Sequence, residues 1–172
     1  MKKLFFLIKH ASWFTRIVAL LALAAALVSI ATVWAGSSTA LDKPIADLPI
    51  LTEYGLFEES DVKEIKAELG KASLNDVKGA VAKNVDDKEV VEMMETIFQV
   101  VSIYGTVIVV LLVLAAVFMK KGLMIFAFIT ALPYCLMFLG MSAITTVAIA
   151  TVVYFVLMTI VNKKYKAYKR AN

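Results

Sequence analysis

The sequence predicts an all-α integral membrane protein with four transmembrane helices and a small helical extracytoplasmic domain between helices 1 and 2. Three observations predict this fold class. The chain of 172 residues is 61% hydrophobic, which is more than a soluble domain usually contains. Its uncharged runs are long enough to cross a bilayer. All fourteen Asp and Glu residues lie between residues 42 and 95, whereas the other charged parts of the chain carry only Lys and Arg.

The uncharged runs set the number of crossings. Residues 17–41 and 96–119 hold one span each, since a crossing needs about 20 apolar residues. The run 122–162 is about twice as long and holds two spans, with a turn at 139–142, where Gly and Ser relax the backbone. The expected segments are a basic lead 1–16, spans 17–35, 97–119, 122–140 and 141–161, a domain 36–96, a loop 120–121 and a basic tail 162–172.

The distribution of charge predicts the orientation. Short loops rich in Lys and Arg remain cytoplasmic, so both termini are expected in the cytoplasm and the acidic domain outside a plasma membrane. The domain has no cysteine, which favours a bacterial membrane over a eukaryotic cell surface. Val33-Trp34-Ala35 before Gly36 resembles a signal-peptide cleavage site. The long charged lead favours an uncleaved anchor, and cleavage would leave the remaining topology unchanged.

Two helices are expected inside the domain. Ser60 is expected to cap a helix over residues 61–69 that Gly70 ends. Ser73, with Asp76 three residues later, has the pattern of a capping box and begins the second helix.

A third helix is expected to start at Asp86, with Glu89 as its capping-box partner, and to continue into the second span as one helix from Asp87 to Met119. The apolar faces of the three helices suit one small core. About 60 residues without a disulfide or metal fold only marginally alone, so the domain is expected to lean on the membrane helices or on a partner.

The segment 48–57 is unusually apolar for a loop. It either covers the helices of the domain or forms a docking patch for another membrane protein. The candidate partner-binding residues are Leu48, Ile50, Leu51, Tyr54, Leu56 and Phe57.

Mildly polar side chains gather in the outer halves of the expected spans. Packing explains them, because small and hydroxylated residues let membrane helices approach. The alternative is an outward-facing intramembrane pocket for a lipid or a peptide segment. Pro133 is expected to kink span three by freeing the carbonyl of Ile129. The candidates for the pocket or for packing are Ser29, Thr32, Ser102, Tyr104, Thr106, Pro133, Tyr134, Thr145 and Thr146. A stripe of small residues in span one supports packing: Ala22, Ala25, Ser29, Thr32 and Gly36.

The basic ends predict membrane anchoring. Residues 3–14 are expected to form a helix in the interface. The cations contact an anionic leaflet, at about 1 kcal/mol each, and nucleic-acid binding is not expected. The predicted anchors are Trp13, Lys120, Lys121, Lys163, Lys164, Lys166, Lys169 and Arg170.

No pattern for catalysis is present. His10 and Cys135 are the single His and Cys, and neither has partners for a triad or a zinc site. The expected spans lack ionisable side chains for coupled transport. The sequence therefore favours a non-catalytic protein that needs no cofactor. Its expected partners are membrane lipid and another membrane or extracytoplasmic protein, or a second copy of itself. Such a protein would be an accessory, regulatory or immunity-type protein. The alternative is a protein that handles lipid or small molecules in the outward-facing pocket.

Overall fold

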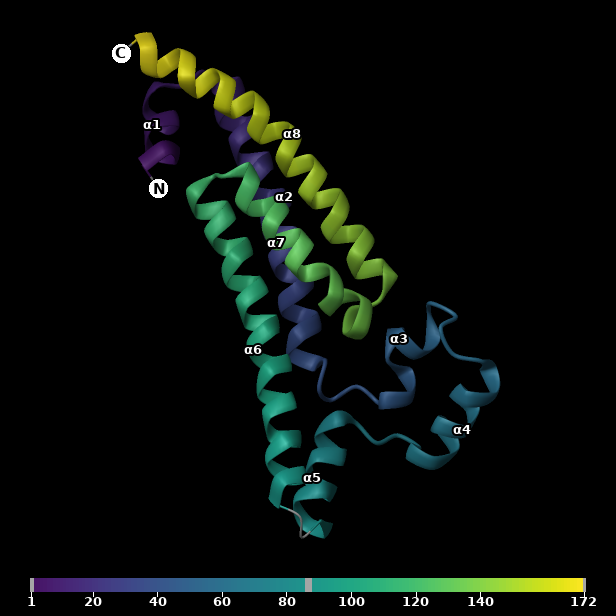
Figure 1. The fold of residues 1–172 in the computed structure, drawn as a ribbon. Coiled ribbons are helices and arrows are strands. Elements are labelled where there is room, and N and C mark those ends of the chain that lie inside the picture. Colours follow the sequence, from purple (N-terminus) through teal and green to yellow (C-terminus); the bar gives the residue numbers. More distant parts are fainter. Residues whose placement is uncertain (1, 86–87, 172) are drawn as a thin grey trace. The chain divides into compact units, whose positions relative to one another are not determined.

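The computed structural model describes residues 2–85 and 88–171, and nearly all of them are helical (Figure 1). Four helical segments are long and apolar enough to cross a membrane, which confirms the expected all-helical, four-span class. They are α2 (Trp13–Thr39), α6 (Lys88–Phe118), α7 (Lys121–Tyr134) continued by the π-helix η2 (Cys135–Leu139), and α8 (Met141–Ala171).

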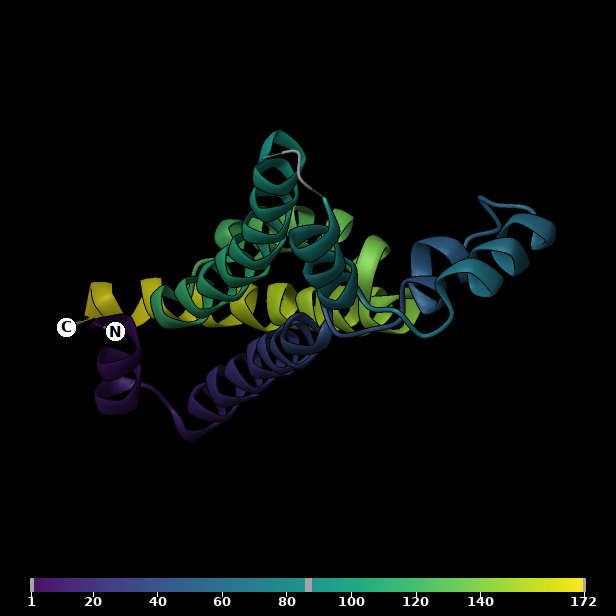
Figure 2. The same ribbon diagram turned by 90° about the horizontal axis from the view of Figure 1, so that it is seen from below.

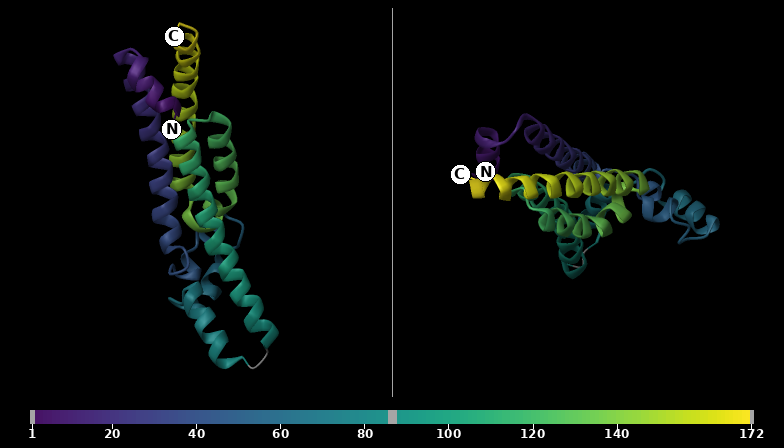
Figure 3. Two further views of the ribbon diagram at one scale, coloured as in Figure 1. Left: turned by 90° about the vertical axis from the view of Figure 1, so that its left-hand side faces the viewer. Right: turned by 90° about the horizontal axis from the view of Figure 1, so that it is seen from above.

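The contacts divide the chain into two compact units. Unit 1 comprises residues 1–32, 108–132 and 145–172, and unit 2 comprises 33–107 and 133–144. In unit 1, parts of the four long helices run side by side (Figure 3).

Small residues at helical spacing form much of the buried face of α2 in unit 1. Ala22, Ala26 and Ser29 of α2 are buried, whereas Ala25 is half-buried. The packing face of α2 therefore differs in phase from the expected stripe, because it follows the 3.6-residue period of the helix rather than a strict heptad. The buried Tyr154 hydroxyl of α8 donates a hydrogen bond of 2.8 Å to the backbone oxygen of Ala115.

The two ends of the chain are helical and touch each other inside unit 1. Helix α1 (Lys2–His10) lies beside the C-terminal part of α8 (Figure 2). Phe6 packs edge-on against Tyr165, with ring centroids 5.3 Å apart, and the Ser12 amide donates to the Tyr168 hydroxyl over 3.2 Å. The expectation of a single helix over residues 3–14 is wrong, because the helix is interrupted at residues 11–12.

Unit 2 holds four short elements between α2 and α6. They are η1 (Ile45–Asp47), α3 (Pro49–Thr52), α4 (Glu59–Leu69) and α5 (Leu74–Asn84). Helix α4 ends at Gly70, which has a φ of +56°, as expected. Its expected start is wrong: the N-cap position is Glu58, not Ser60, and its side chain makes no capping hydrogen bond.

The expected capping box of α5 is confirmed. The Ser73 hydroxyl accepts a hydrogen bond from the Asp76 amide, and the Ser73 amide donates to the Asp76 carboxylate over 2.8 Å. The Ser73 hydroxyl also donates to the Asp76 carboxylate over 2.7 Å. The bond from the Ser73 amide, followed by this bond from its hydroxyl, lowers the pKa of Asp76. The expected cap of the third helix at Asp86 and Asp87 lies outside the described residues. From Lys88 onward the expected continuous helix is present and runs to Phe118.

Helices α4 and α5 bury none of their residues, so the small shared core expected for this segment is not formed by them. Individual polar and cation–π contacts attach α5 to the rest of unit 2 instead. Asn75 donates to Asp42 over 2.7 Å, and Lys78 lies over the buried ring of Phe98, 5.5 Å from its centroid.

The capping box leads to a first prediction. Ser73→Ala should destabilise α5 by about 1 kcal/mol, because an N-cap oxygen is lost, and Ser73→Asn should retain most of the cap. Since Asp76 has a lowered pKa in the folded chain, its contribution is present above the ordinary Asp range and is lost as the pH falls through the folded pKa. Hydrogen exchange of peptides covering 74–84 measures both effects. Equal protection in the Ala and Asn variants would contradict the role of the cap.

Candidate functional site

Two charged side chains fasten the segment after α2 to the turn between η2 and α8, all within unit 2. The Lys43 amine donates to the Phe138 carbonyl over 3.0 Å, and the Glu53 carboxylate accepts from the Met141 amide over 2.6 Å. Lys43 thus meets the carbonyl end of one helix and Glu53 the amide end of the next, where the helix dipoles favour these charges. We call these two contacts the hairpin clamp.

Gly140 makes the clamp possible. Its φ of +87° and ψ of 176° form a conformation that is essentially restricted to glycine. A Cβ at this position would lie 2.6 Å from one carboxylate oxygen of Glu53 and 2.8 Å from the other. The glycine therefore provides both the turn and the space for the carboxylate.

The short helix α3 forms because Pro49 occupies its first position, where the missing amide hydrogen costs nothing. Leu48 and Pro49 are buried, and α3 packs against η2. The Lys66 amine pairs with the Asp47 carboxylate over 3.3 Å and ties α4 to η1. The clamp thus ties the chain on either side of η1 to the turn before α8, and the ion pair ties η1 to α4.

The structure separates the six candidate partner-binding residues into two groups. Leu48 is buried, and Ile50, Leu51 and Tyr54 are half-buried. Leu56 and Phe57, in contrast, expose 67% and 44% of their surface. The first four residues pack at least partly within unit 2. Leu56 and Phe57 are exposed, and they lie between the clamp residue Glu53 and helix α4.

Tyr54 carries a buried hydroxyl without a hydrogen-bond partner among the described residues. Burial, followed by the negative charge of Glu53, raises the pKa of Tyr54. The ring is therefore a packing element, and its removal would disturb the segment itself.

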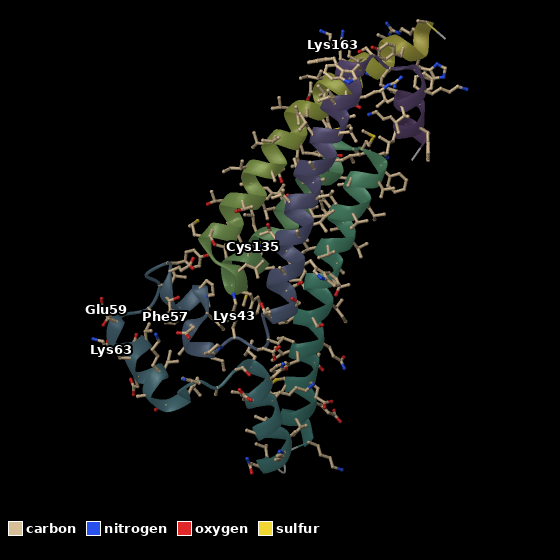
Figure 4. The ribbon with its side chains drawn as sticks, turned by 180° about the vertical axis from the view of Figure 1, so that it is seen from behind. Lys43, Phe57, Glu59, Lys63, Cys135 and Lys163 are labelled. Atoms are coloured by element: carbon tan, nitrogen blue, oxygen red, sulfur yellow. The ribbon has the colours of Figure 1, made fainter. Side chains whose placement is uncertain are left out.

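A groove of about 430 Å³ lies between α3 and α4 beside Phe57. Figure 4 shows Phe57, Glu59 and Lys63 around the start of α4. The lining of the groove combines apolar and charged side chains, as binding grooves commonly do. The lining residues are Leu51, Thr52, Gly55, Phe57, Glu59, Val62, Lys63 and Lys66.

The nine candidates for an intramembrane pocket do not share one environment. Ser29 and Tyr134 are buried, and Thr32 and Tyr104 are half-buried. The remaining five are exposed on the helix surfaces: Ser102, Thr106, Pro133, Thr145 and Thr146. Several hydroxyls bond to their own helix, such as that of Thr106, which donates to the carbonyl of Ser102 over 3.1 Å.

Close helix packing surrounds Tyr134 in unit 2. A Cβ on Gly105 of α6 would lie 2.9 Å from the Tyr134 hydroxyl and 3.0 Å from Ser37 of α2. Tyr104 packs edge-on against the Tyr134 ring, with centroids 5.8 Å apart. The glycine lets three helices approach closely. Pro133 lies within α7, and the helix continues beyond it as the π-helix η2.

An apolar groove of about 310 Å³ runs between α2 and α8 in unit 1. It includes one of the candidate residues, Thr146, at its edge. The lining residues are Ala25, Val28, Thr146, Ile149, Ala150 and Val153. The groove is shallow and apolar, which suits an acyl chain or another helix.

The predicted anchors lie at the ends of the long helices of unit 1. Trp13 begins α2 and exposes 76% of its surface, and Lys121 begins α7. The tail cations are exposed on the last turns of α8: Lys163, Lys164, Lys166, Lys169 and Arg170. Sequence reasoning missed the contact of this tail with α1, although tyrosines at 165 and 168, three residues apart, indicate a packed helical face.

Among residues 2–85 and 88–171, no group of three His, Cys, Asp or Glu side chains is placed to hold a metal ion. No protein-family model matches the chain, and neither a curated protein nor a solved structure matches it.

Proposed function

We propose that this membrane protein acts without catalysis, by binding another membrane or extracytoplasmic protein through Leu56, Phe57 and the adjoining groove. The observation that carries the proposal is the contrast within one segment. Leu48 is buried, yet Leu56 and Phe57 remain exposed on a chain fastened by the hairpin clamp and the Asp47–Lys66 pair. Exposed large apolar side chains on a segment that is tied to its neighbours suit recognition, because a backbone that is already held loses less entropy on binding.

The proposal includes an orientation. The acidic segment between α2 and α6 would form a small extracytoplasmic region of a bacterial plasma membrane, and both termini would lie in the cytoplasm. The Lys and Arg residues of the lead, the 120–121 loop and the tail support this orientation. The partner would then be met outside the cytoplasm, which fits an accessory, regulatory or immunity-type protein.

A double substitution tests the docking surface. Leu56→Ser with Phe57→Ser should remove the partner from the protein purified in mild detergent, since central apolar anchors contribute about 2 kcal/mol each, or roughly 30-fold in affinity. Tyr54 is left intact because its ring packs within unit 2. The matched control is Met93→Ser, which removes an apolar side chain that is 58% exposed on α6.

The expected result is a stoichiometric protein partner with the wild type and with Met93→Ser, and its loss with the double variant at normal membrane abundance. Retention of the partner by the double variant would contradict the proposed surface. Purification with bound lipid and no protein partner would contradict the proposed function.

The second candidate function is lipid or small-molecule handling. The apolar groove between α2 and α8 favours it, because its lining is apolar and includes Thr146, one of the candidate residues. If Thr146→Val abolished the protein's biological function in cells while the Leu56/Phe57 double variant retained it, this second function would be the better account.

A further inference from the structure

A pocket of about 450 Å³ lies in unit 1 where α6 turns into α7. Three lysines contribute to it: Lys3 of α1, and Lys120 and Lys121 at the turn. Helix α6 ends at Phe118, and Met119 turns the chain with a φ of +51°. The turn therefore places two consecutive lysines in the lining of the pocket.

Neutral groups of α8 hold two of these amines in place. Lys3 donates to the side-chain oxygen of Asn162, and Lys121 donates to the Thr159 hydroxyl over 3.1 Å. Lys121 also lies over the ring of Phe155, 4.3 Å from its centroid. The positions of the amines are thus fixed by the fold, and their charges are not neutralised by these partners.

No carboxylate side chain can balance these charges from within the unit, because residues 1–32, 108–132 and 145–172 contain no Asp or Glu. Burial, followed by repulsion from Lys121, lowers the pKa of Lys3, as expected for cations gathered without a counter-ion. An anion placed among the three amines would offset the repulsion between them.

Apolar surface adjoins the cations. Phe118, in the wall of the pocket, exposes 53% of its surface. In the same unit, Phe5 of α1 and Trp13 of α2 expose 65% and 76%. Exposed aromatic side chains and lysines near the ends of long apolar helices are typical of the headgroup region of a bilayer. The occupant should therefore carry both an anionic group and apolar chains.

We propose that this pocket binds the headgroup phosphate of an anionic phospholipid, with Lys3, Lys120 and Lys121 around the phosphate and the acyl chains beside Phe118. Basic pockets between membrane helices are known to select anionic headgroups. The site is independent of the docking surface around Leu56 and Phe57, so either proposal can fail while the other holds.

The test compares lipids retained by the full-length protein in mild detergent, measured by native mass spectrometry. The probes are phosphatidylglycerol, phosphatidylcholine of the same chain length, and inorganic phosphate as a competitor. Phosphatidylglycerol should bind at least tenfold more tightly than phosphatidylcholine. Replacing all three lysines by Gln should remove this preference, since each cation contributes roughly fivefold.

The matched control replaces Lys163, Lys164 and Lys166 by Gln, which removes the same charge from an exposed face of α8. It should retain the preference within about twofold. Lys120→Gln alone should reduce the preference roughly fivefold, and this exposed residue gives a readout if the triple variant fails to fold.

Three outcomes would overturn the proposal. One is equal binding of the two lipids, and another is an equal loss in the tail variant, which would indicate non-specific attraction. The third is displacement of the lipid by an equal concentration of inorganic phosphate, which would indicate a site for a free anion.

Discussion

Gly140→Ala should release the segment around α3 from the start of α8. The φ of +87° is strained for any residue with a Cβ, at a cost of about 1–3 kcal/mol. The new methyl group would also lie 2.6 Å from a Glu53 carboxylate oxygen, so the carboxylate must leave the Met141 amide. We expect faster hydrogen exchange in peptides covering 48–57 and 140–146, and new proteolytic cleavage near residues 53–58.

Two comparisons separate backbone strain from the loss of the clamp. Gly70→Ala introduces a methyl group at a φ of +56° with no atom within 4 Å, so it should show strain without release of α3. In a Glu53→Ala background, Gly140→Ala should cost less than in the wild type, because the colliding carboxylate is absent. Equal costs in the two backgrounds would contradict the described contact between Glu53 and the turn.

The strongest regular patterns in the sequence predict the structure well. Among the described residues, the uncharged runs locate the four helices that are long and apolar enough to span a membrane. Gly140 marks the turn of the hairpin because few other residues adopt its backbone conformation. The capping box at Ser73 is also predictable, since it is formed by neighbours in the sequence. The sequence predicts a kink at Pro133 but not the π-helix that follows it.

Contacts between distant residues escape such reasoning. Lys43 and Phe138 are 95 positions apart, and Glu53 and Met141 are 88 apart, so no local pattern pairs them. The segment 48–57 has neither helical nor strand periodicity, and nothing in its sequence separates the buried Leu48 from the exposed Leu56. The basic pocket combines α1, the α6–α7 turn and α8, and only the fold brings these lysines together.

Orientation connects the proposed sites with the charge pattern. The proposed docking surface belongs to the acidic segment, and the proposed basic pocket to the lead, the 120–121 loop and α8. The proposed orientation would place these two parts of the chain on opposite sides of the membrane. Each part of the chain should therefore be reachable from one side of the membrane only, because a charged segment of this length does not cross a bilayer spontaneously.

Cysteine labelling in intact cells measures the orientation most directly. Single cysteines are introduced at Lys71, Lys121 or Lys166 in a Cys135→Ala background, which removes the native thiol. A membrane-impermeant maleimide should label Lys71→Cys in intact cells, and should label Lys121→Cys and Lys166→Cys only after permeabilisation. Labelling of Lys121→Cys from outside, with Lys71→Cys protected until permeabilisation, would contradict the orientation and the proposed site of partner recognition.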